Sequence, residues 1–253
     1  MIVFYIIILK KEAMNNENIS IYIDGCKELG LSLSEEQLKQ FIRYYEMLIE
    51  KNKVMNLTAI TDFEEVIKKH FLDSLLIVQA ADLTKVDKMI DVGTGAGFPG
   101  IPLKIVFPEL SVTLADSLNK RVLFLEECIR ELNFRKIDAV HGRAEDLGKN
   151  REYREKYDLA VSRAVANLSS LSEYCIPFVK KGGSFIAYKS AEILDEYKAA
   201  KKAIHVLGGE SSEPDHFTLP KTDLTRSFVI IKKVKETPGK YPRKAGLPSK
   251  EPL

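Results

Sequence analysis

A glycine-rich run after an apolar segment is the part of this sequence that points most directly to chemistry. The apolar segment ends at Asp91, and glycines follow at positions 93, 95, 97 and 100. Glycine is needed where a chain turns sharply and brings its backbone against a ligand, because it carries no Cβ. Two interpretations fit. Gly95-x-Gly97-x-x-Gly100 matches the dinucleotide pattern, whereas Asp91-x-Gly93-x-Gly95-x-Gly97 matches the loop that methyltransferases fold around S-adenosylmethionine.

Two further features lie close to this loop. A helix is predicted to begin near Pro99, and its first turn would offer unpaired N–H groups to an anionic or polar ligand. Asp116 ends the second predicted strand, 19 residues beyond Gly97 (116 − 97). A carboxylate there faces the ribose hydroxyls of either cofactor. The alternative is that Asp116 only caps the following helix.

The segment Gly142-Arg-Ala-Glu-Asp-Leu147 separates the two cofactors. In methyltransferases an acidic residue after the third strand commonly meets the adenine edge, and nicotinamide enzymes have no equivalent need for it. The end of the chain agrees, because Phe217–Leu219 and Phe228–Lys233 have hairpin spacing. A reversed last strand is typical of methyltransferase sheets. Both observations favour the methyl donor.

Short apolar strands alternate with helices from residue 88 onward, which indicates βαβ units and a parallel sheet with right-handed crossovers. The predicted strands are Met89–Val92, Val112–Ala115, Ile137–Val140, Leu159–Val161 and Ser184–Tyr188. The predicted helices are Ile101–Phe107, Lys120–Leu132, Leu168–Val179 and Ile193–Leu207.

The first third of the chain is predicted to be a helical lobe, residues 15–85. Ser34-Glu-Glu-Gln37 is a capping-box signature at the start of one helix, and a second helix is expected over Phe63–Ile77. The methyltransferase domain would cover residues 86–233, and residues 234–253 would form a basic tail lying extended on the surface. Residues 1–14 are interpreted as an upstream extension, with translation starting at Met14.

Composition excludes several classes of protein. The 253 residues carry a formal net charge of +2. Three separated cysteines fit neither a zinc site nor a disulfide framework, so no metal and a reducing, cytoplasmic location are expected. The apolar stretch Ile2–Leu9 is too short to span a bilayer, which needs about 20 residues, and no membrane association is expected. A monomer is expected.

Several motifs in order resemble the RsmG (GidB) family of bacterial rRNA methyltransferases. They are Asn56-Leu-Thr58, His70–Leu75, Asp91–Leu103, Asp116–Val122, Ser162-Arg-Ala164 and the closing Tyr241–Leu253. The resemblance implies a class I S-adenosylmethionine-dependent fold, Rossmann-like, with a mostly parallel seven-stranded sheet and an antiparallel last strand. It also implies N7-methylation of a guanine in the decoding-region loop of 16S rRNA. One residue departs from the pattern, because Ser190 follows Lys189 where the family usually has glycine.

The family's donor contacts carry over onto matching positions. Gly93, Gly95, Gly97 and Phe98 would line the methionine and adenosine pocket, together with Asp116. Ala144 and Glu145 would meet the adenine. Arg163 would lie beside the donor at the end of the fourth strand, and the alternative for it is a surface ion pair with Glu145 or Asp146.

The proposed chemistry requires no catalytic base, because guanine N7 has an exposed lone pair and no proton at neutral pH. No catalytic residue is therefore predicted. RNA contacts are expected from the basic tail, and the candidate residues are His70, Lys189, Arg243, Lys244 and Lys250. A solvated tail without RNA contacts is the alternative, and His70 taken alone fits a helix-surface or core position.

Three other functions remain open from sequence. The chain could bind RNA or the ribosome without turnover, methylate a substrate other than RNA, or be a nicotinamide-dependent oxidoreductase. The complete glycine loop, Asp116 and Glu145 argue against the first, because a protein without turnover has no need of a donor pocket.

Overall fold

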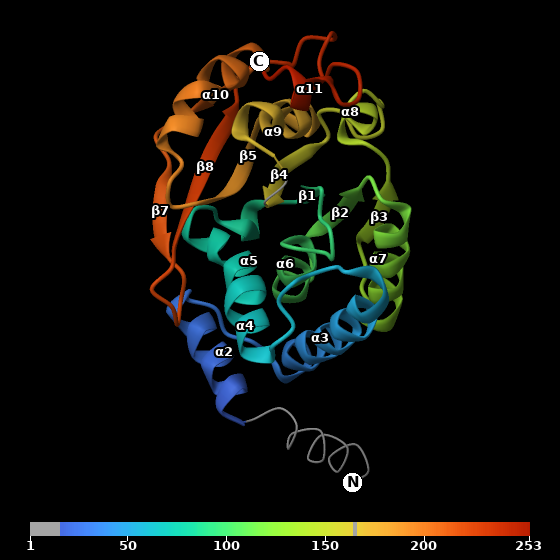
Figure 1. Cartoon of the computed structure of the whole chain (residues 1–253), viewed down its shortest axis with the longest axis vertical. Coiled ribbons are helices and arrows are strands. Elements are labelled where there is room, and N and C mark those ends of the chain that lie inside the picture. Colours follow the sequence, from blue (N-terminus) through green and yellow to red (C-terminus); the bar gives the residue numbers. More distant parts are fainter. Residues whose placement is uncertain (1–15, 164–165) are drawn as a thin grey trace.

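The computed structural model describes residues 16–163 and 166–253, and its centre is a twisted β-sheet (Figure 1). The predicted upstream extension, residues 1–14, and Ala164 of the Ser162–Ala164 motif lie outside this range. The strands are β1 Lys88–Val92, β2 Ser111–Asp116, β3 Ile137–His141, β4 Tyr157–Arg163, β5 Val179–Ser190, β6 Gly209–Ser211, β7 Asp215–Thr218 and β8 Thr225–Lys233.

Sheet order in the described ranges is β3-β2-β1-β4-β5-β8-β6, with β7 also paired to β8. Strands β1 to β5 are parallel, and β8 runs antiparallel to β5. Both β6 and β7 pair antiparallel with different parts of β8. Eight strands therefore occupy seven positions. The parallel sheet, the reversed last strand and the terminal hairpin are confirmed, and β6 was not predicted.

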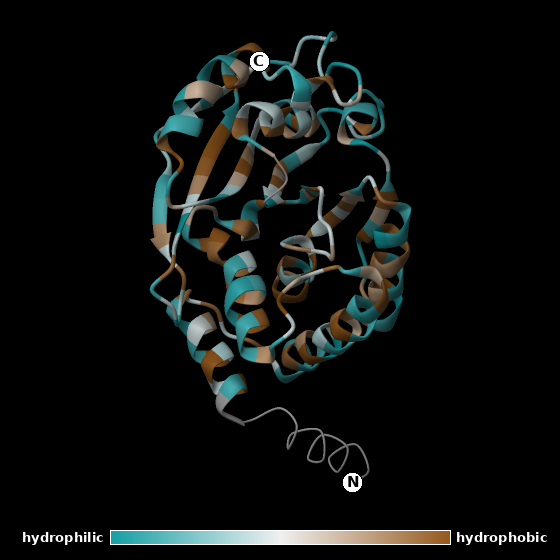
Figure 2. Ribbon diagram, in the orientation of Figure 1, coloured by the Kyte–Doolittle hydropathy of each residue, from teal (hydrophilic) through white to brown (hydrophobic). Residues whose placement is uncertain are grey.

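Two apolar cores lie on opposite faces of the sheet because alternate side chains of a strand point to opposite sides. Met89 and Leu159 belong to one core, and their neighbours Ile90 and Ala160 belong to the other. Figure 2 shows hydrophobic segments along the central strands. The covering helices are α6 Gly100–Val106 and α7 Asn119–Glu131 on the first face, and α8 Ala144–Leu147, α9 Leu168–Cys175 and α10 Leu194–Val206 on the second. Short 3₁₀ turns, η3 Leu83–Lys85 and η4 Ile176–Phe178, precede β1 and β5.

The N-terminal lobe shares the first core with the sheet. It begins with α2 Asn16–Glu28 and α3 Glu35–Met55, and the predicted capping box is present at Ser34 and Gln37. The Gln37 amide also donates to the carbonyls of Ile105 and Val106, at 2.9 and 3.2 Å. One side chain thus begins α3 and joins it to the end of α6.

The second predicted helix of the lobe is present but irregular. Its four pieces are α4 Phe63–Val66, η1 Ile67–Leu72, α5 Asp73–Leu75 and η2 Leu76–Gln79. The piece η1 is a π-helical turn that contains His70. Such turns are rare and often occur at functional sites. The π-helical turn therefore makes Ile67–Leu72 a candidate part of a functional site.

The C-terminal tail is not extended, and this prediction was wrong. It folds back over α8 and α9 and ends in α11 Leu247–Lys250. The Arg154 guanidinium donates to the carbonyls of Thr237 and Tyr241, at 2.6 and 2.8 Å, which holds the start of the tail. A local reading of a basic, proline-rich segment cannot reveal such distant partners. Among the described residues, no helix is long and apolar enough to cross a membrane.

Candidate active site

The glycine loop connects β1 to α6 at the carboxyl edge of the sheet. Gly93, Gly95 and Gly97 have φ values of 72°, 64° and 110°, a region that L residues rarely adopt. A Cβ on Gly95 would have no atom within 4 Å, whereas one on Gly100 would lie 2.3 Å from Leu114 Cδ2. Gly95 therefore faces open space, and Gly100 permits close packing of α6 on the sheet.

Asp91 holds the loop from inside. Its carboxylate is fully buried, and Oδ2 accepts hydrogen bonds from Thr94 Oγ1 at 2.7 Å and from Gly100 N at 2.8 Å. Burial raises the pKa of Asp91 to about 7, although these two hydrogen bonds act in the opposite direction.

The predicted anion site at the start of α6 is wrong for this reason. The first N–H of the helix, that of Gly100, binds Asp91. The next, that of Ile101, donates to the Gly97 carbonyl at 2.8 Å, and residue 102 is a proline without an N–H. The Asp91 carboxylate thus occupies the N–H group to which an anionic ligand would otherwise bind.

Asp116 joins the glycine loop to the start of α7. Its Oδ2 accepts from Gly95 N and its Oδ1 from Leu118 N, both at 2.9 Å. Arg121 Nη1 lies 3.4 Å from Oδ2. Asp116 does not cap α7, whose N-cap is Leu118 without a side-chain cap, so the capping alternative is wrong. Asp116 lines both cavities described next.

Two adjoining cavities open at this edge of the sheet, of about 430 and 370 Å³, and they share Gly93, Asp116 and Ser117. Volumes of roughly 300–1,000 Å³ are usual for small-molecule sites. The first is lined by Val92, Gly93, Ala115, Asp116, Ser117, Gly142, Arg143, Ala144, Glu145, Ala166, Tyr174, Gly246, Ser249 and Lys250. The second is lined by Leu57, Thr58, His70, Gly93, Thr94, Gly95, Ala96, Phe98, Asp116, Ser117, Arg121 and Arg163.

Most of the predicted donor residues are brought together by these cavities. Gly97 is the exception, because a Cβ there would point at Ile101 and at the Tyr44 hydroxyl, 2.5 and 2.9 Å away. Gly97 supports the loop without lining either cavity. A larger cavity of about 840 Å³ lies at the opposite, amino edge of the sheet and contains none of the predicted site residues.

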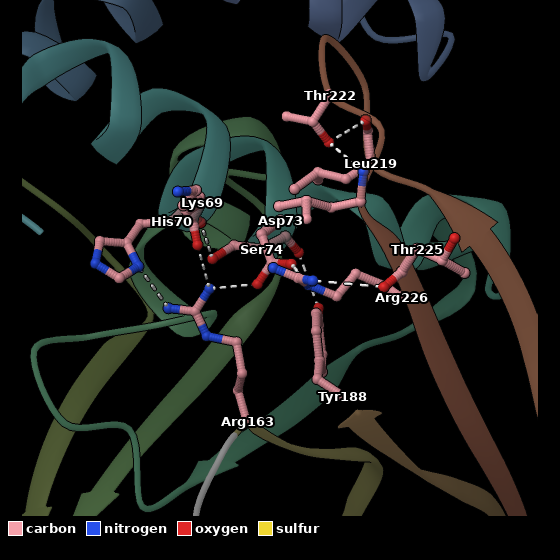
Figure 3. Close-up of polar contacts among 11 residues, drawn as sticks. Lys69, His70, Asp73, Ser74, Arg163, Tyr188, Leu219, Thr222, Thr225 and Arg226 are labelled. Carbon is pink, nitrogen blue, oxygen red and sulfur yellow. Dashed lines mark hydrogen bonds and ion pairs between the residues drawn. The ribbon is translucent and has the colours of Figure 1, made fainter. Parts of the chain in front are cut away.

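Arg163 belongs to a polar cluster at the edge of the second cavity (Figure 3). Its Nη1 lies 2.7 Å from Asp73 Oδ2, and Arg226 Nε lies 2.5 Å from the other oxygen of the same carboxylate. Only 5% of the Asp73 side chain is exposed. The predicted alternative, pairing of Arg163 with Glu145 or Asp146, is wrong, because the partner is supplied by the N-terminal lobe.

His70 lies between this cluster and the glycine loop. The His70 ring stacks on the Phe98 ring, with the two ring centroids 4.6 Å apart. The guanidinium carbon of Arg163 also lies over the Phe98 ring, 5.0 Å from its centroid. His70 Nδ1 is 3.4 Å from Arg163 Nη2, and Nε2 is 2.8 Å from Thr58 Oγ1. A guanidinium only donates, so Nδ1 accepts and Nε2 carries the proton. Burial, followed by the charge of Arg163, lowers the pKa of His70 to about 4.

The other predicted RNA residues differ in their surroundings. Lys189 Nζ is occupied by the Ala166 carbonyl at 2.7 Å and by Glu196 at 2.6 Å. Arg243 is paired with the buried Glu173. Lys244 and Lys250 are exposed, and Lys250 also lines the first cavity.

The departure at Ser190 does not strain the backbone. Ser190 pairs with Arg226 in the regular ladder between β5 and β8, and it is absent from the residues with positive φ. Position 190 therefore needs no conformation reserved for glycine.

Sequence reasoning missed Asp73, Arg226 and Glu173. Asp73 lies within the quoted segment His70–Leu75, which was the available signal. No local pattern marks Arg226 or Glu173, because their partners are 153 and 70 residues away.

Solved structures share this arrangement of sheet and helices. An S-adenosylmethionine-dependent O-methyltransferase from Thermotoga maritima aligns with a TM-score of 0.50 and 17% identity, over 75% of this chain and 72% of that one. The YcgJ protein of Bacillus subtilis aligns with a TM-score of 0.50 and 12% identity, over 66% and 100%. At such low sequence identity, the similarity shows only that the fold is shared. The protein has the class I S-adenosylmethionine-dependent methyltransferase fold, as predicted.

Sequence comparison is more specific. The profile described as GidB, rRNA small subunit methyltransferase G, matches residues 37–225. The Ribosomal RNA small subunit methyltransferase G of Lachnoclostridium phytofermentans is 53% identical over 234 residues, 92% of this chain and 97% of its own length. That of Thermoanaerobacter sp. is 50% identical over 240 residues, 95% and 100%. The chain belongs to the rRNA small subunit methyltransferase G (GidB) family, which confirms the predicted resemblance.

Proposed function

We propose that this protein transfers a methyl group from S-adenosylmethionine to N7 of a guanine in the decoding-region loop of 16S rRNA. The observation that carries the proposal is the family match over residues 37–225, on a fold whose carboxyl edge holds a cavity of suitable size and polarity. S-adenosylmethionine supplies an electrophilic methyl group on a sulfonium, with a thioether as leaving group.

The residues of the two cavities suit the donor's parts. Asp116 accepts hydrogen bonds from Gly95, Leu118 and Arg121, and a carboxylate has about four lone-pair sites. Capacity therefore remains for a ribose hydroxyl. Ala144 and the buried Glu145 line the first cavity, where the adenine would bind.

The second cavity suits the methionine end of the donor. Arg163 and Arg226 share one carboxylate, that of Asp73, and His70 next to them is neutral above about pH 4. The cluster thus has an excess of one positive charge. This excess favours an anionic group, and the donor's carboxylate is one.

The acceptor reaction makes small demands on the protein. Guanine N7 is nucleophilic without loss of a proton, so alignment of N7 with the methyl carbon and exclusion of water are the main requirements. His70 agrees with this, because both ring nitrogens are engaged and its pKa is low. We assign no catalytic base.

The RNA is proposed to bind at the mouth of the cavities. The exposed lysines Lys244 and Lys250 lie on the folded tail beside the first cavity, and lysines bind phosphates in a salt-dependent way. Bases in A-form helices are inaccessible from the narrow major groove. A guanine in a loop, turned out of the stack, fits a site of this kind. We also propose that the enzyme acts as a monomer in the cytoplasm.

Chemical mapping of N7-methylguanine in 16S rRNA, from cells with and without this gene, tests the proposal. We expect one modified position in the decoding-region loop to disappear with the gene and to return with a plasmid copy. A map that does not change, from a protein that binds S-adenosylmethionine, would reject the substrate and leave a methyltransferase with another acceptor. Tight NAD binding without donor binding would reject the class.

A further inference from the structure

The last 14 residues of the chain, 240–253, form a segment that we call the strap. It packs against α9 and reaches α8 (Figure 1). Three of its residues, Gly246, Ser249 and Lys250, line the first cavity together with Gly142–Glu145. The strap is therefore part of the cavity wall.

One buried ion pair anchors the strap. The Glu173 side chain, on α9, is completely buried and receives the Arg243 guanidinium through Nε and Nη2, at 3.0 and 2.7 Å. The backbone N–H of Arg243 adds a third bond, at 2.7 Å to Glu173 Oε1. Removing one member of a buried pair leaves an uncompensated charge, so the strap has a strong preference for this position.

Two further bonds connect the anchored strap to the cavity. Ser170 Oγ, on α9, donates to the Pro248 carbonyl at 2.7 Å. The Gly246 N–H donates to Glu145 Oε1 at 2.7 Å. Glu145 is only 5% exposed, so this N–H determines how its carboxylate is oriented at the place where the adenine would bind. Tyr174, the residue after Glu173, lines the same cavity.

We propose that Glu173 and Arg243 are positioning residues for the methyl donor. Their pair holds the strap as the outer wall of the adenosyl site and, through Gly246, orients Glu145. This inference rests on the proposed donor and is independent of the acceptor. Arg243, a predicted RNA contact, acts instead through the protein's own buried carboxylate.

Calorimetry with S-adenosylmethionine, in the absence of RNA, tests the proposal in the full-length protein. Glu173→Gln keeps the shape of the side chain and removes its charge. Arg243→Lys keeps the charge and loses the two-nitrogen geometry. We expect the dissociation constant to rise at least about tenfold in Glu173→Gln and by a smaller factor in Arg243→Lys. In turnover with RNA, the KM for the donor should rise in both variants, while kcat at saturating donor stays within about twofold.

A second Arg–Glu pair, more exposed than the first, provides a control for the same substitutions. Arg43 Nη2 and Glu131 Oε2 are 2.9 Å apart and join α3 to α7, away from both cavities. Glu131→Gln and Arg43→Lys should leave donor affinity unchanged. If Glu173→Gln and Arg243→Lys lower only the melting temperature and bind the donor normally, the positioning role is rejected and the pair is merely structural. If the unaltered protein binds no donor, the proposed function itself is wrong.

Discussion

Asp73 accepts hydrogen bonds from Arg163 and Arg226, which lie 90 and 153 residues further along the chain. Its carboxylate is buried, so each arginine is held in a defined position. Tyr188 supports the same segment, because its hydroxyl donates to the Ser74 carbonyl at 2.8 Å (Figure 3). At the scale of single residues, one edge of the second cavity is thus built by contacts between the lobe and three strands, β4, β5 and β8.

His70 makes the stability of the protein depend on pH. Its pKa is about 4 in the folded protein, whereas about 6.5 is usual in an unfolded chain. Between these values the unfolded chain binds the extra proton, so the contribution is complete above about pH 6.5 and is lost as the pH falls toward 4. We expect the free energy of unfolding to fall by roughly 2–3 kcal/mol more in the unaltered protein than in His70→Gln over this range.

Urea denaturation at pH 7.0, 5.5 and 4.0 measures this difference. Taking the difference between the two proteins removes contributions from other groups, including Asp91. Its raised pKa acts with the opposite sign, because the folded state binds the extra proton and stability is lost as the pH rises toward 7. Parallel pH profiles for the two proteins would show that His70 does not titrate as described.

At the scale of elements, the β1–α6 loop combines two kinds of glycine. Gly95 faces the second cavity, with open space where a Cβ would lie, and Gly100 is pressed against buried atoms of Leu114 and Asp91. The spacing of glycines in the sequence does not distinguish Gly95 from Gly100. The missing side chain leaves room for a ligand at Gly95 and permits close packing at Gly100.

Alanine at these two positions should therefore have different effects. Gly95→Ala places an L residue at a φ of 64°, which costs roughly 1–2 kcal/mol, and adds a methyl group to the donor site. We expect weak destabilisation with a clear loss of donor affinity. Gly100→Ala puts Cβ 2.3 Å from Leu114 Cδ2, and such overpacking typically costs about 1–3 kcal/mol.

Thermal unfolding and donor titration, carried out on both variants, distinguish these effects. Gly100→Ala should be the less stable protein, and the fraction that remains folded should bind the donor better than Gly95→Ala does. The opposite order in donor affinity would mean that Gly95 does not face the ligand.

At the scale of the whole molecule, the N-terminal lobe and the strap line two different cavities at the same edge of the sheet. The lobe contributes Thr58 and His70 to the second cavity, and the strap contributes Gly246 and Lys250 to the first. The strap also carries exposed lysines. If the function is as proposed, the strap would contact both the methyl donor and the RNA.

Lys244→Ala tests the RNA part of this arrangement. Lys244 is exposed and lines neither cavity, so donor affinity without RNA should not change. The affinity for a decoding-region RNA fragment should fall, and the slope of log affinity against log salt should decrease by about 0.7–0.9 for one lost phosphate contact. Lys136→Ala, which removes a lysine paired with Glu109 at the amino edge, is the control. Equal slopes for the unaltered protein, Lys244→Ala and Lys136→Ala would mean that the RNA does not contact Lys244.

Much of the fold follows from local sequence. The positions of β1 to β4 and of the main helices were predicted within a few residues, because strand and helix periodicities depend on neighbouring side chains. Strand β5 was predicted too short, because it begins at Val179 and not at Ser184. The capping box at Ser34 is equally local. The π-helical turn at Ile67–Leu72 was not predicted, since the apolar spacing there suits an ordinary helix.

The sequence by itself determined the family, the donor loop and most residues that line the cavities, because those residues lie within short segments that end parallel strands. Only the tertiary structure decided which charges pair. Asp73 with Arg163 and Arg226, and Glu173 with Arg243, are joined across 70 to 153 residues. Which of these residues pair depends on the strand order and on the path along which the C-terminal tail folds back. Local sequence spacing encodes neither. For that reason a tail that the sequence predicted to be an extended basic segment forms part of the wall of the first cavity.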